Sequence, residues 1–190
     1  MRGTAASLCG LEQDDAHAVA RLLLLYGVAL SSGGIPLIYL GDEVGTLNDP
    51  SYVNDPGKAD DSRWVHRPAR DAARYAQRHD PSTDAGRIHA GLRHLIALRR
   101  HLPPLAGGRL IPFLTHNPAV LGYQREGTQP GQGRVLVLGN FSEFVQVVGA
   151  EVLSAMPQQM VDLIGQTASD TRQGLTLAPY QMLWLVQRGA

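Results

Sequence analysis

Residues 35–40 have the sequence Ile35-Pro36-Leu37-Ile38-Tyr39-Leu40, a continuous apolar run with Gly33-Gly34 before it and Gly41 after it. The run shows no alternation of apolar and polar residues, which is typical of a parallel strand covered on both faces. Pro36 is compatible with this interpretation because proline is tolerated at the start of a strand. We therefore expect a buried parallel strand over residues 35–40.

A helix is expected directly before this run. Asp14-Asp15 can cap it, the residues from Ala16 to Tyr26 are apolar on most faces, and Gly33-Gly34 provide a stop. A helix, a tight glycine turn and a buried strand together form an αβ unit. The pattern therefore favours a parallel α/β architecture for this part of the chain.

A long turn-rich stretch and a second helix follow. Residues 41–79 show no clear period, and a structureless stretch of this length inside a domain is usually either functional or a sign that its elements have been assigned wrongly. Asp80-Pro81 then provide a cap and a first helical residue, and apolar residues recur at helical spacing over residues 81–102. Pro103-Pro104 end this helix, and we expect the domain boundary there.

The remaining residues, 105–190, have a different composition. They contain short segments rich in β-branched and aromatic residues, separated by glycine, proline and asparagine, which predicts a small antiparallel β-sandwich. The expected strands are Leu110–Leu114, Val120–Arg125, Arg134–Leu138, Phe144–Val148, Met160–Leu163 and Tyr180–Val186. We therefore expect an α/β domain over residues 1–104 and an all-β domain over residues 105–190.

Composition excludes several classes of protein. Seventeen basic residues balance seventeen acidic ones, so no overall field favours nucleic acid or an anionic membrane surface. The longest apolar run, residues 22–30, is shorter than the roughly 20 residues that span a bilayer. Residues 1–4 lack the features of a signal peptide, and the single cysteine, Cys9, cannot form an intramolecular disulfide, so we expect a cytoplasmic protein.

Asp42 and Glu43 follow the expected strand, and the carboxyl ends of strands carry the active sites of α/β barrels. Two acids that act on a glycosidic bond face each other across roughly 5–9 Å, whereas adjacent residues on an extended chain point to opposite sides. Asp42 and Glu43 are therefore not an acid and nucleophile pair, and at most one faces a site. The alternative is a carboxylate that holds the following loop by accepting backbone hydrogen bonds.

A second constellation is Asp60-Asp61-Ser62-Arg63-Trp64-Val65-His66-Arg67. Acids, guanidinium groups and an aromatic face are what a sugar pocket needs, but the same side chains could lock a loop. The spacing of the aspartates does not match a twelve-residue calcium loop, and the histidines lack a zinc-binding spacing. We expect no metal site.

Several of these segments resemble a known family. Gly34 to Glu43 is similar to the eighth-strand segment of the α-amylase superfamily, family 13 of the glycoside hydrolases. More narrowly, the chain resembles the amylosucrases over Gly3-Thr4-Ala5-Ala6-Ser7, Gly41 to Asp49, Asp60 to Trp64, Asp80 to Thr83, Gly139 to Glu143 and Pro179 to Leu185. The similarity extends over essentially the whole chain, with the motifs in family order.

The resemblance implies the last part of a (β/α)₈ barrel followed by a carboxy-terminal antiparallel β-sandwich. It also implies transfer of glucose from sucrose to an α-1,4-glucan with release of fructose, without a cofactor. Arg63 would lie at the base of the glucosyl pocket, paired with an aspartate from the early part of the barrel. Asp61 and Asp42 are the other candidate substrate-binding residues, and sucrose and α-glucan are the implied partners.

The family's nucleophile, acid/base and transition-state-stabilising carboxylates lie on earlier strands and have no counterpart in this sequence. We therefore assign no catalytic residue and expect the chain alone to be inactive, with the missing amino-terminal part of the barrel as a further partner. One alternative is a non-catalytic carbohydrate-binding or complementing module. Another is a fragment of a different family 13 enzyme, such as sucrose hydrolase, sucrose phosphorylase or trehalose synthase.

Overall fold

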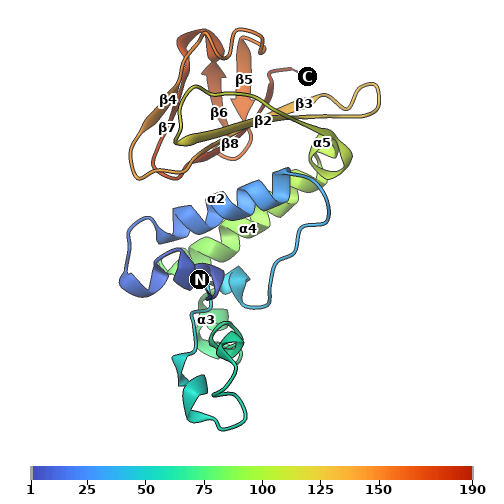
Figure 1. Cartoon of the computed structure of the whole chain (residues 1–190). Coiled ribbons are helices and arrows are strands. Elements are labelled where there is room, and N and C mark those ends of the chain that lie inside the picture. The colour runs from blue at the N-terminus through green and yellow to red at the C-terminus, as the bar shows by residue number, and fades with distance from the viewer. Residues whose placement is uncertain (1, 190) are drawn as a thin grey trace. The chain divides into compact units, whose positions relative to one another are not determined.

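The computed structural model describes residues 2–189 (Figure 1). The chain divides into two compact units, one formed by the residues up to Leu23 and Leu37–Arg93, the other by Leu24–Pro36 and the residues from His94 onward. Helices α2 (Ala18–Ser31) and α4 (Asp84–Arg100) lie side by side, and each contributes residues to both units. These are the two long helices expected from the sequence.

The first unit contains short elements besides the amino-terminal parts of these helices. Within residues 41–79 the chain forms 3₁₀ turns and one short helix, so most of this stretch is irregular, as expected. The elements are α1 (Ala5–Leu8), η1 (Leu11–Gln13), η2 (Asp42–Val44), η3 (Pro50–Asn54), η4 (Ser62–His66) and α3 (Ala72–Gln77). Thr83 rather than Asp80 caps α4, because its Oγ1 accepts a hydrogen bond from Gly86 N at 3.1 Å.

The second unit is built on an antiparallel sheet. Helix α5 (Pro103–Gly107) leads into it, and its six strands lie in the order β1-β2-β3-β8-β5-β6, while β4 and β7 form a separate two-stranded sheet. The strands are β1 (Arg109–Pro112), β2 (Val120–Glu126), β3 (Arg134–Asn140), β4 (Gln146–Val148), β5 (Gln159–Asp162), β6 (Thr167–Asp170), β7 (Leu175–Leu177) and β8 (Met182–Gln187). All six expected strands are present, and β6 and β7 are additional.

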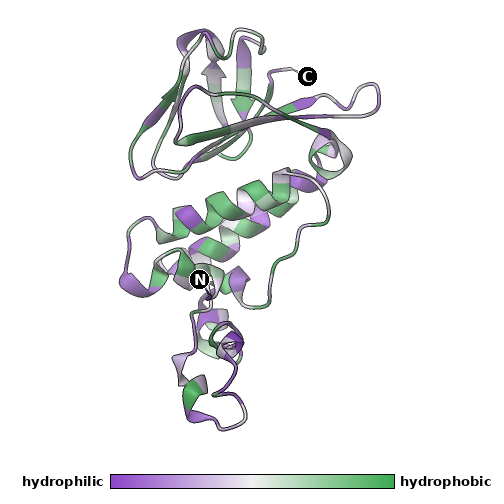
Figure 2. Ribbon diagram, viewed as in Figure 1, coloured by the Kyte–Doolittle hydropathy of each residue, from purple (hydrophilic) through white to green (hydrophobic). Residues whose placement is uncertain are grey.

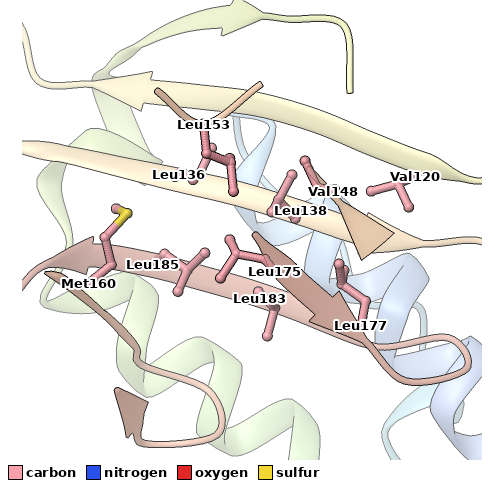
Figure 3. Close-up of a cluster of buried hydrophobic side chains, with 10 residues drawn as sticks. All are labelled: Val120, Leu136, Leu138, Val148, Leu153, Met160, Leu175, Leu177, Leu183 and Leu185. Carbon is pink, nitrogen blue, oxygen red and sulfur yellow. The ribbon is translucent and has the colours of Figure 1, made fainter. Parts of the chain in front are cut away.

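The large sheet is covered on both faces. One face carries Leu136, Leu138 and their neighbours, which pack against Val148, Leu175 and Leu177 from the two-stranded sheet (Figure 3). The opposite face carries Val135, Val137, Tyr123, Met182 and Trp184, which pack against Leu24, Leu30, Leu95 and Leu105 from the helices. Because both faces are buried, the central strands lack a polar face, and Figure 2 shows that most of α2 is hydrophobic.

The core beneath the sheet explains why the boundaries between the two units fall within α2 and α4. The carboxy-terminal halves of α2 and α4 supply side chains to the core beneath the sheet, so the unit that holds the sheet includes residues 24–36 and 94–102. The expected boundary at Pro103-Pro104 falls at the start of α5, the short helix that precedes the sheet. The boundary between the compact units lies earlier, between Arg93 and His94.

The expectation of a buried strand over residues 35–40 is wrong for this chain. Residues 35–39 have no regular secondary structure, and Ile35, Leu37 and Leu40 are 99%, 79% and 74% exposed. A strand requires hydrogen-bonded neighbours. Among the described residues no strand pairs with this segment, so its apolar side chains face solvent.

Two arginines anchor the turn that leads into this segment. Arg125, which is 3% exposed, donates to the carbonyl oxygens of Ser32 at 2.7 Å, Gly108 at 2.6 Å and Pro104 at 3.1 Å. Arg99 donates to Gly34 O at 2.8 Å. The two arginines therefore hold residues 32–34, the turn before the exposed segment, to β2 and α4.

A buried carboxylate organises another turn of the same unit. Asp162 is 1% exposed and accepts hydrogen bonds from three backbone N–H groups, those of Ile164 at 3.2 Å, Gly165 at 2.7 Å and Trp184 at 2.9 Å. Burial raises the pKa of Asp162, and the three donors oppose that shift. The carboxylate thus joins β5 to β8 and closes the turn that follows β5.

Within residues 2–189, no helix has the length and apolar character needed to cross a bilayer.

Candidate functional site

A pocket of about 270 Å³ lies in the first unit. Three stretches of the chain form it, and two of them, at residues 3–5 and at Asp42, belong to segments that resemble the amylosucrases. It is lined by Gly3, Thr4, Ala5, Tyr39, Asp42, His66 and Arg67. These residues supply one carboxylate, one guanidinium, one imidazole and one phenol.

Asp42 reaches the pocket through a tight turn. Gly41 adopts φ 99°, and a Cβ at that position would lie 2.6 Å from the hydroxyl oxygen of Thr46, so glycine is required here. Asp42 begins the 3₁₀ turn η2, its backbone N–H donates to Tyr39 O at 3.0 Å, and the residue is 8% exposed. The turn thus places a largely buried carboxylate at the pocket wall.

Glu43 has a different role from its neighbour. Its Oε2 accepts a hydrogen bond from Gly41 N at 2.8 Å, and its Oε1 accepts one from the Tyr75 hydroxyl at 2.5 Å. Burial, and next the bond to Glu43, raise the pKa of Tyr75. Glu43 therefore ties its own turn to α3, which is the loop-holding role considered for one of the two acids, while Asp42 lines the pocket.

Backbone and side-chain hydrogen bonds hold the two pocket segments together. Asn48 Oδ1 accepts from Thr4 N at 2.8 Å, and Asn48 N donates to the Ser7 hydroxyl at 2.9 Å. Asp49 N donates to Val65 O at 2.8 Å and so connects this segment to η4. Three stretches far apart in the sequence thus meet through a few polar contacts.

Asp61 and Arg63, both predicted as substrate-binding residues, lie outside the lining of this pocket. Arg63 Nε lies 2.8 Å from Asp61 Oδ1, and its Nη2 lies 2.8 Å from Asp61 Oδ2. These side-chain bonds, with a further bond from Arg63 N, lower the pKa of Asp61 to about 2. The Arg63 side chain remains 62% exposed, so the pair holds the start of η4 and leaves the guanidinium accessible.

His66 and Arg67, from the end of the same turn, line the pocket instead. His66 Nδ1 is buried without a hydrogen-bond partner among the described residues. The expected aromatic platform, Trp64, has Lys58 Nζ at 5.2 Å and Arg67 Cζ at 5.6 Å from its ring centroid, so cations lie against the indole. Trp64, His66 and Arg67 all belong to the constellation that the sequence singled out, but no spacing signal distinguished those at the pocket.

The arrangement suits binding better than bond cleavage. Carboxylate, guanidinium and imidazole groups can hydrogen-bond to hydroxyls, whereas glycoside cleavage needs two facing carboxyl groups. Asp42 is the one carboxylate among the lining residues that the structure describes. Over residues 2–189, no group of three or more His, Cys, Asp or Glu side chains is placed to hold a metal ion.

Comparison with known proteins gives similarity at the level of fold. No family model matches the sequence. An AmyP variant in complex with maltotriose aligns with a TM-score of 0.71 and 17% identity, over 92% of this chain and 36% of the AmyP chain. A variant of the trehalulose synthase MutB aligns with a TM-score of 0.66 and 20% identity, over 97% of this chain and 42% of MutB, and another MutB variant was solved with the substrate sucrose.

Isomaltulose synthase PalI from Klebsiella sp. LX3 is similar in the same way. It aligns with a TM-score of 0.61 and 18% identity, over 97% of this chain and 41% of PalI. The chain thus spans 36–42% of the length of these proteins. The match over nearly the whole chain confirms the expected fold class, a late α/β barrel portion followed by an antiparallel β-sandwich, with the segment 35–40 as the exception.

Proposed function

We propose that this chain is the carboxy-terminal portion of a family 13 glucosyltransferase similar to amylosucrase, acting on sucrose and an α-1,4-glucan. The observation that carries the proposal is the pocket in the first unit, because two of the amylosucrase-like segments, residues 3–7 and 41–49, contribute residues to it and are joined by hydrogen bonds. Two of the similar structures, trehalulose synthase and isomaltulose synthase, support the same broad class of chemistry.

In this proposal the chain binds and positions sugar, and the rest of the parent enzyme supplies the reacting carboxylates. Asp42 and the exposed Arg63 are the candidate substrate contacts, with Asp61 orienting Arg63 through their paired hydrogen bonds. The exposed apolar segment at residues 35–40 would pair with the missing barrel strands. Hydrolysis or transfer would then require both parts together.

The test is fructose release from sucrose by the purified chain, alone and mixed with a separately produced amino-terminal portion of an amylosucrase. We expect no release from the chain alone and measurable release from the mixture. The matched pair Asp42→Asn and Glu143→Gln removes one acid at the pocket and one exposed acid in the β-sandwich. Only Asp42→Asn should lower the rate of the mixture.

Two results would contradict the proposal. Release by the chain alone would show that it carries its own reacting groups. Absence of release from a mixture in which the two portions form a stable complex would show that the parent activity is different. Product analysis separates the related enzymes, because sucrose hydrolase yields free glucose, sucrose phosphorylase a glucose phosphate, and trehalose synthase acts on a different disaccharide.

The second candidate function is a carbohydrate-binding module without catalysis. The observation in its favour is that the pocket has a single carboxylate among its described lining residues. Saturable binding of maltotriose by the chain, together with no fructose release from any mixture, would favour this function over the first.

A further inference from the structure

Helix α3 adds no residue to the hydrophobic core of the first unit. None of its six residues is buried, and all of them except Arg74 and Tyr75 are exposed. A helix of this length is not stable by itself, because isolated helices in water are marginal below about 12–15 residues. Its place in the fold therefore depends on the contacts of Arg74 and Tyr75.

Tyr75 holds the start of the turn η2. Its hydroxyl donates to Glu43 Oε1 at 2.5 Å, and Glu43 Oε2 accepts from Gly41 N at 2.8 Å. Hydrogen bonds to an ionised acceptor are stronger than those between neutral groups. The Arg70 guanidinium lies over the Tyr75 ring, 4.5 Å from its centroid, and keeps the ring in place. The carboxylate of Glu43 thus joins α3 to the residue directly before Asp42.

Arg74 holds the other end of the same turn. Its Nη1 donates to Val44 O at 3.3 Å, and its Nε lies 3.8 Å from the carboxylate of Asp71, the residue that caps α3. The side chain of Arg74 is only 19% exposed, so it is largely withdrawn from water. Asp42 lies between the two points that α3 holds, Gly41 and Val44, and it lines the pocket.

We propose that α3 acts as a clamp that positions the Asp42 carboxylate at the pocket, with Tyr75 and Arg74 as positioning residues. Val44 is fully buried, so the turn stays attached to the core without α3. The clamp adds a fixed position for the half of the turn that carries Asp42. A contact between Asp42 and substrate rests on the proposed function, and the inference deepens that function by naming the residues that act through Asp42.

The first test is native-state hydrogen exchange of the 190-residue chain, followed by NMR. Three amides report on the turn, those of Gly41, Gly45 and Thr46, which donate to acceptors within it at 2.8–3.1 Å. Tyr75→Phe removes the donor to the Glu43 carboxylate and should make these amides exchange about tenfold faster, the effect of losing one hydrogen bond to a charged group. Amides of α4 and of the large sheet should keep their rates.

The matched control is Tyr52→Phe. Tyr52 lies in η3 of the same unit, and no hydrogen bond of its hydroxyl is present among the described residues, so exchange in the turn should not change. Arg74→Met is a second variant and decides the matter if Tyr75→Phe does not fold. It should make the Gly45 amide exchange about threefold faster, because the bond it removes is longer. Unchanged exchange in the turn, or equal acceleration throughout the chain, would overturn the clamp.

The second test separates positioning from folding, in the mixture of the chain with the amino-terminal portion of an amylosucrase. Because Asp42 is proposed to bind sugar while the other portion supplies the reacting groups, a displaced Asp42 should raise KM for sucrose and leave kcat unchanged. We expect Tyr75→Phe to raise KM about threefold to tenfold. A variant that only destabilises the complex should lower the apparent kcat instead. In an Asp42→Asn background, Tyr75→Phe should have little further effect on KM.

The two tests distinguish failure of this inference from failure of the proposed function. If the unmodified mixture releases no fructose, the proposed function fails, and hydrogen exchange alone decides whether α3 holds the turn. If the mixture is active and Tyr75→Phe leaves KM unchanged, the positioning role of Tyr75 is wrong although the proposed function stands. Additive effects of Tyr75→Phe and Asp42→Asn on KM would also overturn the inference, because Tyr75 would then act independently of Asp42.

Discussion

Replacing Arg125 by methionine tests whether a buried guanidinium without a carboxylate partner stabilises the second unit. Arg125 is 3% exposed and donates to three carbonyl oxygens, and no ion pair of this side chain is present among the described residues. Methionine fills a similar volume without a donor. After the change Pro104 O still accepts from Gly108 N, at 3.0 Å, whereas Ser32 O and Gly108 O lose the arginine donor.

The expected loss of stability follows from two opposing effects. Two carbonyl groups left without this donor cost about 1–3 kcal/mol each, or about 2–6 kcal/mol together. Removing a buried charge relieves part of the cost of desolvating the guanidinium. We therefore expect Arg125→Met to lower the free energy of unfolding by about 2–4 kcal/mol.

The assay is urea unfolding followed by tryptophan fluorescence. A Trp64→Phe background leaves Trp184, which is fully buried in the core beneath the sheet, as the reporter of the second unit. The matched control is Arg134→Met in the same hairpin, because the Arg134 side chain is 66% exposed and its ion pair with Glu126 lies at the surface. We expect the control to cost less than about 1 kcal/mol. Equal effects of the two substitutions would refute the reasoning, since burial would then not determine the contribution of the arginine.

Three further predictions concern single residues. The carboxyl of Asp61, followed by carbon NMR, should titrate near pH 2, and its pKa should rise towards 3.8 in Arg63→Ala. Because the pKa of Asp61 is lowered in the folded chain, the stabilisation that its carboxylate provides is present above pH 3.8 and is lost as the pH falls to about 2. Gly41→Ala should lower the free energy of unfolding by about 2–3 kcal/mol, because a positive φ is combined with a Cβ only 2.6 Å from the buried hydroxyl of Thr46. The control Gly131→Ala, at a residue with positive φ and open space around it, should lower it by about 1–2 kcal/mol. Equal losses of the two variants in urea unfolding would contradict the steric argument. Asp162→Ala leaves three backbone N–H groups without their acceptor and should lower the free energy of unfolding, measured by thermal unfolding, by about 2–4 kcal/mol. A loss below about 0.5 kcal/mol would show that water replaces the carboxylate.

Local patterns predicted the regular elements well. Helical spacing of apolar residues predicted α2 and α4, and runs of β-branched and aromatic residues predicted six of the eight strands. The two strands that the sequence did not predict, β6 and β7, are three or four residues long, and Thr167–Asp170 has no apolar alternation. Short edge strands depend on their neighbours more than on their own residues.

The candidate site was predicted in composition and missed in detail. The sequence singled out Asp42 and the constellation from Asp60 to Arg67, and the structure places members of both at one pocket. It did not indicate that His66 and Arg67 line this pocket while Asp61 and Arg63 pair with each other beside it. That division depends on how the turn η4 folds, and the polar residues of the constellation are chemically suited to either role.

The sequence by itself determined the two long helices and six of the eight strands, because those choices depend on side chains a few residues apart. Only the tertiary structure decided what each surface faces. The apolar run Ile35 to Leu40 has the composition of a buried strand, yet it is exposed because strand pairing comes from other parts of a fold. In the same way, Arg125 lies in a strand that local patterns predict, and its burial against three backbone carbonyls follows from contacts with residues distant in the sequence.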